Sequence, residues 1–108
     1  MALIDTGASA TAISAKVIKD VGLMSIGKKP VGGVHGHRPT NLYQFQVGLV
    51  FPQSPSPTGA INANIAPFPV TGPEFVPLGP SFDILLGRDV LCHGTFSMSW
   101  DGHAVICV

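Results

Sequence analysis

Short apolar segments separated by glycine and proline are the feature that most limits what this chain can fold into. Thirteen glycines and ten prolines divide its 108 residues, and both residue types favour turns. Between positions 42 and 51, apolar residues partly alternate with polar ones, as on a half-buried strand. Asp101-Gly102 is a two-residue hairpin signal between segments 95–100 and 103–108. With a modest strand expected at 61–65 and buried strands at 2–4 and 82–86, we predict an all-β fold.

Two segments carry helix signals. Ser14 is suited to the N-cap of a helix that ends near Val21, because apolar residues follow at helical spacing and Gly22 can end it. A second short helix is expected over residues 88–93, before Gly94. The fold is therefore expected to hold one or two short helices.

Three further segments are marked by glycine or proline. Residues 30–40 are rich in glycine and lie between extended stretches. Residues 52–57 hold prolines and serines and are predicted to form a loop. Residues 67–80 contain five prolines, and because proline cannot donate to a strand ladder, we predict an irregular or edge region there.

Length and charge limit the classes of protein that are possible. A chain of 108 residues is expected to form a single domain over residues 1–108. Only 11% of its residues are charged, against about 25% in average soluble domains, and its mean hydropathy is +0.40. This low charge is consistent with association with a partner or with a second copy. Six basic and six acidic residues cancel, so binding to nucleic acid is not expected.

The sequence also bears on location and on cysteine chemistry. No apolar run reaches the roughly 18 residues that cross a bilayer, and residues 1–5 do not resemble a signal peptide. Cys92 and Cys107 are too few for a disulfide framework, and we expect both to be reduced and buried. These features predict a cytoplasmic protein without a membrane partner.

Asp5-Thr6-Gly7 is the main candidate for chemistry. A carboxylate at the end of a buried strand, followed by a hydroxyl and a glycine, suits the active-site loop of an aspartic protease. Such enzymes need two carboxylates that share one proton: one acts as general base on a water and the other polarises the scissile carbonyl. The same triplet also suits an ordinary turn.

A second motif lies far downstream, at Ile84-Leu85-Leu86-Gly87-Arg88-Asp89. Together with Asp5-Thr6-Gly7 it resembles the retropepsin-like aspartic proteases, a single-domain family that includes the retroviral proteases. The resemblance covers nearly the whole chain from Ala2 onward. Retroviral members usually carry an acid where this chain has Ser9, so it is more similar to the cellular and bacterial branches. Arg88 is then expected to pair with a backbone carbonyl or with Asp89.

The resemblance implies a half-barrel fold with a flap hairpin and a homodimer in which each subunit contributes Asp5. It implies that the enzyme cleaves extended polypeptides without a cofactor. Three residues would support the catalytic loop: Thr6, Gly7 and Ala8. The flap, within positions 32–40, would contact substrate through Gly33, Val34, His35 and Gly36. The later motif would be structural, through Leu86, Gly87, Arg88 and Asp89.

The same residues also bear on other functions. A non-catalytic dimerisation or peptide-binding module on this fold is the alternative. His35, His37 and the pair Cys92-His93 lack the spacing of a zinc site, so we expect no metal. No serine has the context of a hydrolase nucleophile. Because family members place one or more strands before the catalytic triplet, the chain is expected to lack its N-terminal strand or strands, with a weakened dimer.

Overall fold

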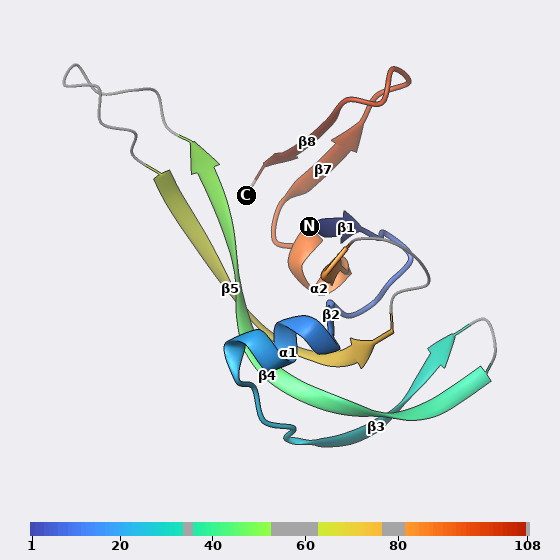
Figure 1. Ribbon diagram of the computed structural model, residues 1–108. Helices are drawn as coiled ribbons and strands as arrows, with labels where there is room; N and C mark the ends of the chain where they lie inside the picture. Colours follow the sequence, from blue (N-terminus) through green and yellow to red (C-terminus); the bar gives the residue numbers. More distant parts are fainter. Residues whose placement is uncertain (34–35, 53–62, 77–81, 108) are drawn as a thin grey trace.

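A computed structural model of the chain describes residues 1–33, 36–52, 63–76 and 82–107 (Figure 1). Within these ranges the chain is mostly strand, as predicted. The strands are β1 (Ala2–Ile4), β2 (Ala12–Ser14), β3 (Gly27–Gly33), β4 (Gly36–Pro52), β5 (Ala63–Phe75), β6 (Ile84–Leu86), β7 (Thr95–Met98) and β8 (Ala104–Cys107). The helices are α1 (Ala15–Val21) and α2 (Arg88–Leu91). The all-β class and the two short helices are confirmed for the described residues.

The main sheet has the strand order β1-β6-β2-β5-β4-β3. β6 lies between two strands from the start of the chain: it runs parallel to β1, with Leu3 opposite Leu85, and antiparallel to β2, with Ile13 opposite Ile84. β6 therefore separates β1 from β2, and the segment that joins them must pass around it. This arrangement brings the two sequence motifs together.

Helix α1 begins and ends where its sequence signals indicate. The side chain of Ser14 accepts a hydrogen bond from the Val17 N–H, and Gly22 adopts a left-handed conformation with φ 75°. The Gly22 N–H donates to the carbonyl of Ile18. Both ends of the helix thus have partners for backbone groups that the helix itself leaves unpaired.

Ser14→Ala is expected to lower the free energy of unfolding by about 1 kcal/mol, because the N-cap acceptor for Val17 is lost. Urea denaturation followed by circular dichroism measures the change. Ser9→Ala is the matched control, since Ser9 is exposed and makes no side-chain hydrogen bond within the described residues. An equal effect of both substitutions would contradict the capping role.

Strand β5 corrects the prediction for the proline-rich region. Pro67, Pro69 and Pro73 lie inside β5, paired with positions on β4. These prolines are separated by even numbers of residues, so their backbone nitrogens lie on the same side of the strand. That side can face away from β4. Between 63 and 72 that side has no neighbouring strand among the described residues. The segment is thus an edge, as predicted, but it is a regular strand.

Gly72 of β5 lies where another strand passes very closely. A Cβ atom at this position would lie 1.9 Å from the carbonyl oxygen of Thr11. Only glycine allows β5 to approach the start of β2 at this distance.

The core lies between the β4–β5 ribbon, β6 and α2. Its buried members are Val47, Val70, Leu86, Val90 and Leu91, and four partly buried residues pack against them: Phe45, Leu49, Phe68 and Ile106. Of these, Val90 is among the least exposed, at 1%. Burying one such aliphatic side chain contributes about 1.5–3 kcal/mol. Because α2 supplies two of the buried residues, the later motif is anchored to the core.

Several burial predictions are wrong. Leu3 and Ile4 in β1 are 44% and 37% exposed, because within the described ranges β1 is an edge strand that pairs only with β6. In β6 only Leu86 is buried, while the rest of segment 82–86 is half-buried. Cys92 and Cys107 are free, as predicted, but both are exposed. Cys107 belongs to β8, which among the described residues pairs only with β7, in a two-stranded sheet separate from the main sheet.

The hairpin of β7 and β8 projects from the body as a separate arm (Figure 1). Its loop is longer than the predicted two residues, because pairing stops at Met98 opposite Ala104. The Asp101 carboxylate organises this loop: it accepts hydrogen bonds from the Ser99 hydroxyl and the His103 N–H. These contacts, that of Ser99 first, lower the pKa of Asp101.

The remaining strand and loop predictions differ mainly at their ends. β4 includes the predicted strand 42–51 but is longer at its start. β5 begins at Ala63, within the predicted strand 61–65. α2 ends at Leu91, before the predicted end at His93. The predicted loop falls mainly on residues 53–57, which lie outside the described residues, as do Pro77 and Pro80.

Candidate active site

Asp5 directly follows the edge strand β1. The Asp5 N–H donates to the carbonyl of Leu86 at 3.0 Å, which extends the pairing of β1 with β6 by one residue. The Asp5 side chain is half-buried. Its backbone position is therefore fixed by Leu86 of the later motif, while part of its carboxylate remains accessible.

The loop that follows is closed by Asp5 itself. The Gly7 N–H donates to Asp5 Oδ1 at 2.9 Å, and the Ala8 N–H donates to the Asp5 carbonyl at 3.2 Å. A Cβ atom on Gly7 would lie 3.2 Å from Asp5 Oδ1, so a larger residue would push on the carboxylate. The triplet thus forms a tight turn in which the Gly7 N–H holds one oxygen of the Asp5 carboxylate, and Thr6 and Gly7 are exposed to solvent.

The later motif packs directly against this loop. The Arg88 N–H donates to the Ala8 carbonyl at 2.9 Å. A Cβ atom on Gly87 would lie 2.6 Å from the carbonyl carbon of Ala10 and 2.9 Å from the Thr11 nitrogen. Only glycine fits at position 87, because the backbone of Ala10 and Thr11 passes so closely. Residues 86–88 thus form the surface against which the Asp5 loop packs, called here the floor of the loop.

Thr11 and Asp89 form a buried hydrogen-bond network beneath the loop. The Thr11 hydroxyl donates to Asp89 Oδ1 at 2.7 Å, and the Thr11 N–H lies 2.9 Å from both Asp89 oxygens. The same hydroxyl accepts from the Gly87 N–H at 3.0 Å. The Asp89 carboxylate also accepts from the Val90 N–H. Thr11 is completely buried, so this network fixes the loop to the start of α2.

Thr11 is the structural residue that the sequence analysis missed. Thr11 lies directly before β2 between two alanines, and a buried hydroxyl in such an apolar setting needs a hydrogen-bond partner, which was the available signal. The predicted pairing of Arg88 with Asp89 is also wrong, because the Asp89 carboxylate instead accepts hydrogen bonds from Thr11 and Val90. Arg88 is exposed, and its side chain has no ion-pair or hydrogen-bond partner within the described ranges.

The predicted flap lies on the hairpin of β3 and β4. Gly33 is paired with Gly36, which has a left-handed φ of 98°. Val34 and His35, the remaining predicted flap residues, lie outside the described residues. The structure thus places Gly33 and Gly36 opposite each other, at the end of β3 and the start of β4.

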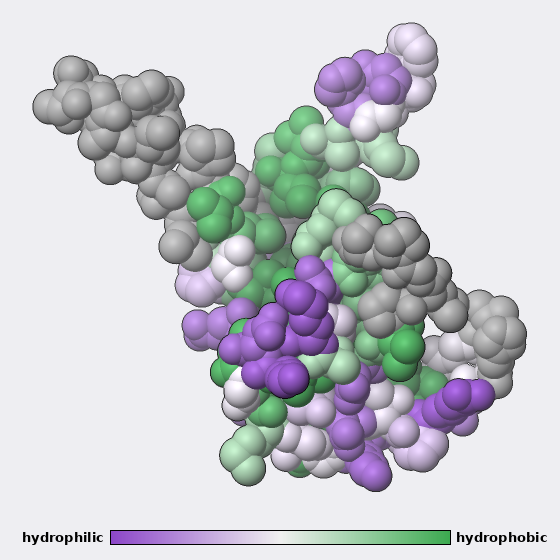
Figure 2. Space-filling view, in the orientation of Figure 1, coloured by the Kyte–Doolittle hydropathy of each residue, from purple (hydrophilic) through white to green (hydrophobic). Residues whose placement is uncertain are grey.

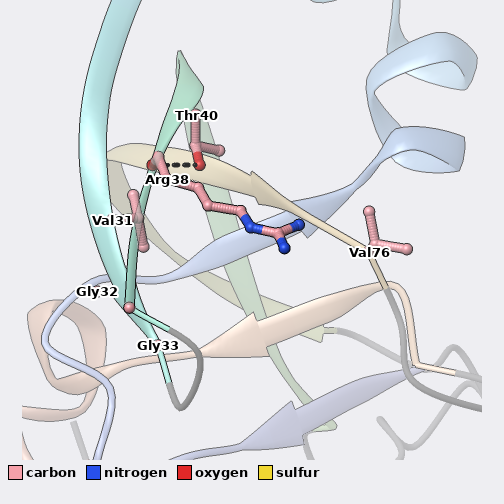
Figure 3. A pocket seen from close by; sticks show the side chains of 7 residues that line it. Val31, Gly32, Gly33, Arg38, Thr40 and Val76 are labelled. Carbon is pink, nitrogen blue, oxygen red and sulfur yellow. Dashed lines mark hydrogen bonds between the residues drawn. The ribbon is translucent and has the colours of Figure 1, made fainter.

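A hollow of about 330 Å³ lies beside this hairpin (Figure 3). Its lining comprises Val31, Arg38, Thr40, Val76 and the three glycines at positions 32, 33 and 36. Figure 3 shows the guanidinium of Arg38 extending across the hollow toward Val76. Asp5 is not among the lining residues, so the Asp5 loop and this hollow are separate features of the described chain.

Nothing in the described ranges indicates a metal or a membrane span. No three His, Cys, Asp or Glu side chains gather there in a way that could hold a metal ion. No helix in those ranges is long and apolar enough to cross a bilayer.

Comparison with protein-family models, with curated proteins and with solved structures finds no match. The case for a function therefore depends on the residues and their geometry. The structure brings the segment from Asp5 to Ala8 into contact with the segment from Leu86 to Asp89, and it adds Thr11 to them.

Proposed function

We propose that this chain is an aspartic endopeptidase of the retropepsin-like type, with the half-barrel fold of that class, which works as a homodimer. The observation that carries the proposal is the fixed but accessible carboxylate of Asp5. One of its oxygens accepts from Gly7, and its loop is held by β6 and by the Thr11–Asp89 network. The bond from Gly7 alone is that of an ordinary Asx turn, so it is the support from a segment about 80 residues away in sequence that favours a functional carboxylate.

The proposed reaction needs two carboxylates, and each chain supplies one. In the dimer, Asp5 of each subunit lies near a two-fold axis, and the two carboxylates share one proton. The ionised carboxylate removes a proton from a water, and that water attacks the scissile carbonyl carbon. The protonated carboxyl polarises the carbonyl oxygen, and the tetrahedral intermediate then releases an amine and a carboxylic acid.

Exposed apolar side chains support the dimer. Leu3 and Ile4 of β1 lie directly before Asp5 and are partly exposed, and the β7–β8 arm exposes Met98 and Trp100 by 72% and 99%. Figure 2 shows apolar residues gathered along this arm where it joins the body, and polar residues over α1. A chain with few charges and such apolar surface next to its candidate catalytic loop is suited to association with a copy of itself.

The substrate in this proposal is an extended polypeptide. The β3–β4 hairpin acts as the flap, and the peptide lies as an added strand between the flap and the Asp5 loop. The glycines of the hairpin provide the backbone freedom that a closing flap requires.

The rate of hydrolysis is expected to be highest at about pH 4 to 6, because two nearby carboxylates must share a single proton. Digestion of an unfolded protein across the range from acidic to alkaline pH, followed by mass spectrometry of the products, measures this profile. A rate that rises steadily toward alkaline pH would exclude a carboxylate pair. Absence of cleavage at every pH would favour the non-catalytic binding module.

A further inference from the structure

Arg38 gives the hollow beside the β3–β4 hairpin a cationic side. Among the described residues that line the hollow, Arg38 alone carries a charge, and Val31 and Val76 supply apolar walls. The guanidinium extends into the space between them (Figure 3). Within the described ranges it forms no ion pair. The hollow therefore combines an unpaired cation with apolar walls.

The pairing of β3 with β4 decides which neighbours share this face. Val31 lies opposite Arg38, and Lys29 lies opposite Thr40, so all four side chains are on the same face of the hairpin. Lys28 lies opposite Asn41, on the other face. The face that holds the hollow thus carries two cations.

The nearest acidic residue of the neighbouring strand does not neutralise this face. Glu74 of β5 lies on the same face as Tyr43 and accepts a hydrogen bond from its hydroxyl at 3.5 Å. Tyr43 and Thr40 occupy opposite faces of β4, because their positions differ by an odd number. The charge around the hollow is therefore positive.

The hollow also has room for a side chain of another molecule. Added Cβ atoms at Gly33 and Gly36 would meet nothing within 4 Å. Its volume, about 330 Å³, is at the lower end of the range for ligand pockets. A carboxylate matches the planar guanidinium of Arg38 and can accept two of its hydrogen bonds.

We propose that this hollow binds an aspartate or glutamate side chain of the peptide substrate, with Arg38 as the residue that determines this specificity. The carboxylate pairs with the guanidinium, and the methylenes of the acidic side chain contact Val31 and Val76. The assignment of the ligand as a peptide rests on the proposed function. Arg38 takes no part in the chemical step, which belongs to Asp5.

A synthetic library of randomised short peptides tests the proposal by two readouts. Cleavage by the wild-type protein at about pH 5, above the ordinary pKa of Asp and Glu, shows which residues flank the cut bond. Capture of the same library on immobilised Asp5→Asn protein shows which residues favour binding without hydrolysis. Arg38→Gln is compared with Lys28→Gln, which removes the same charge from the opposite face of the hairpin.

Because Arg38 is exposed, we expect peptides with an acidic residue to be favoured by at most about fivefold over matched neutral ones, as for an exposed ion pair. Arg38→Gln should remove this preference and Lys28→Gln should keep it. An absent preference, or one that persists in Arg38→Gln, would overturn the proposal. If capture shows the Arg38-dependent preference while no peptide is cleaved, the hollow is an acid-binding site and the proposed protease activity is wrong.

Discussion

Asp5→Asn is expected to abolish peptide hydrolysis while the fold is kept. The substituted side chain can still accept the hydrogen bond from Gly7 through its amide oxygen, so the turn of the loop is preserved. It cannot act as a general base, and a dimer of the variant holds no carboxylate at either position. Removal of a group at the centre of a mechanism costs at least about 10³-fold in kcat.

The measurement is the initial rate of digestion of an unfolded protein at about pH 5, with circular dichroism as the check on folding. Asp20→Asn is the matched control, because Asp20 is an exposed carboxylate that pairs only with Lys16 on α1 among the described residues. It should leave the rate unchanged. Full activity in a folded Asp5→Asn protein would remove Asp5 from the mechanism.

Loss of the Thr11–Asp89 network is expected to cause the largest loss of stability. Asp89→Ala leaves the buried N–H and hydroxyl of Thr11 without their acceptor, and each unsatisfied buried group costs about 1–3 kcal/mol. We therefore expect a loss of about 3 kcal/mol in the free energy of unfolding, measured by urea denaturation. The rate of hydrolysis should fall as well, because the floor of the Asp5 loop is loosened.

A double-mutant cycle separates this network from general damage. Thr11→Val removes the hydroxyl at similar volume and leaves the Gly87 N–H without its acceptor. Thr71→Val is the control, because Thr71 is exposed on β5 and such surface changes stay within about 0.5 kcal/mol. If the effects of Thr11→Val and Asp89→Ala are simply additive, with no interaction energy of about 1 kcal/mol or more, the two residues do not act together.

The sequence predicted those elements correctly whose ends depend only on residues nearby in the chain. Helix α1 could be predicted because Ser14 and Gly22 act on backbone groups within one turn of themselves. The prolines of β5 predicted an irregular or edge region, and only the edge is observed, because the effect of proline depends on which side of the strand is paired, and that is set by β4. Burial of Cys107 was also wrong, since β8 pairs only with β7 in a projecting arm.

The candidate site could be predicted only in part, for the same reason. The two motifs identified the segments that meet, at Asp5 and at Gly87. The partner of Thr11 could not be recognised, because Asp89 lies 78 residues away and the sequence does not show that the two are close in space. The hollow at Arg38 could not be predicted either, because its other wall, Val76, lies far away in sequence, directly after β5.

The central claim, that two Asp5 carboxylates form one site, is tested most directly by mixing subunits. Wild-type protein and Asp5→Asn protein are combined in equal amounts at constant total concentration, allowed to exchange subunits, and assayed for hydrolysis. If only dimers with two Asp5 residues are active, random pairing leaves about one quarter of the activity of the undiluted wild type. About one half would show that each subunit works alone, and would contradict the shared site.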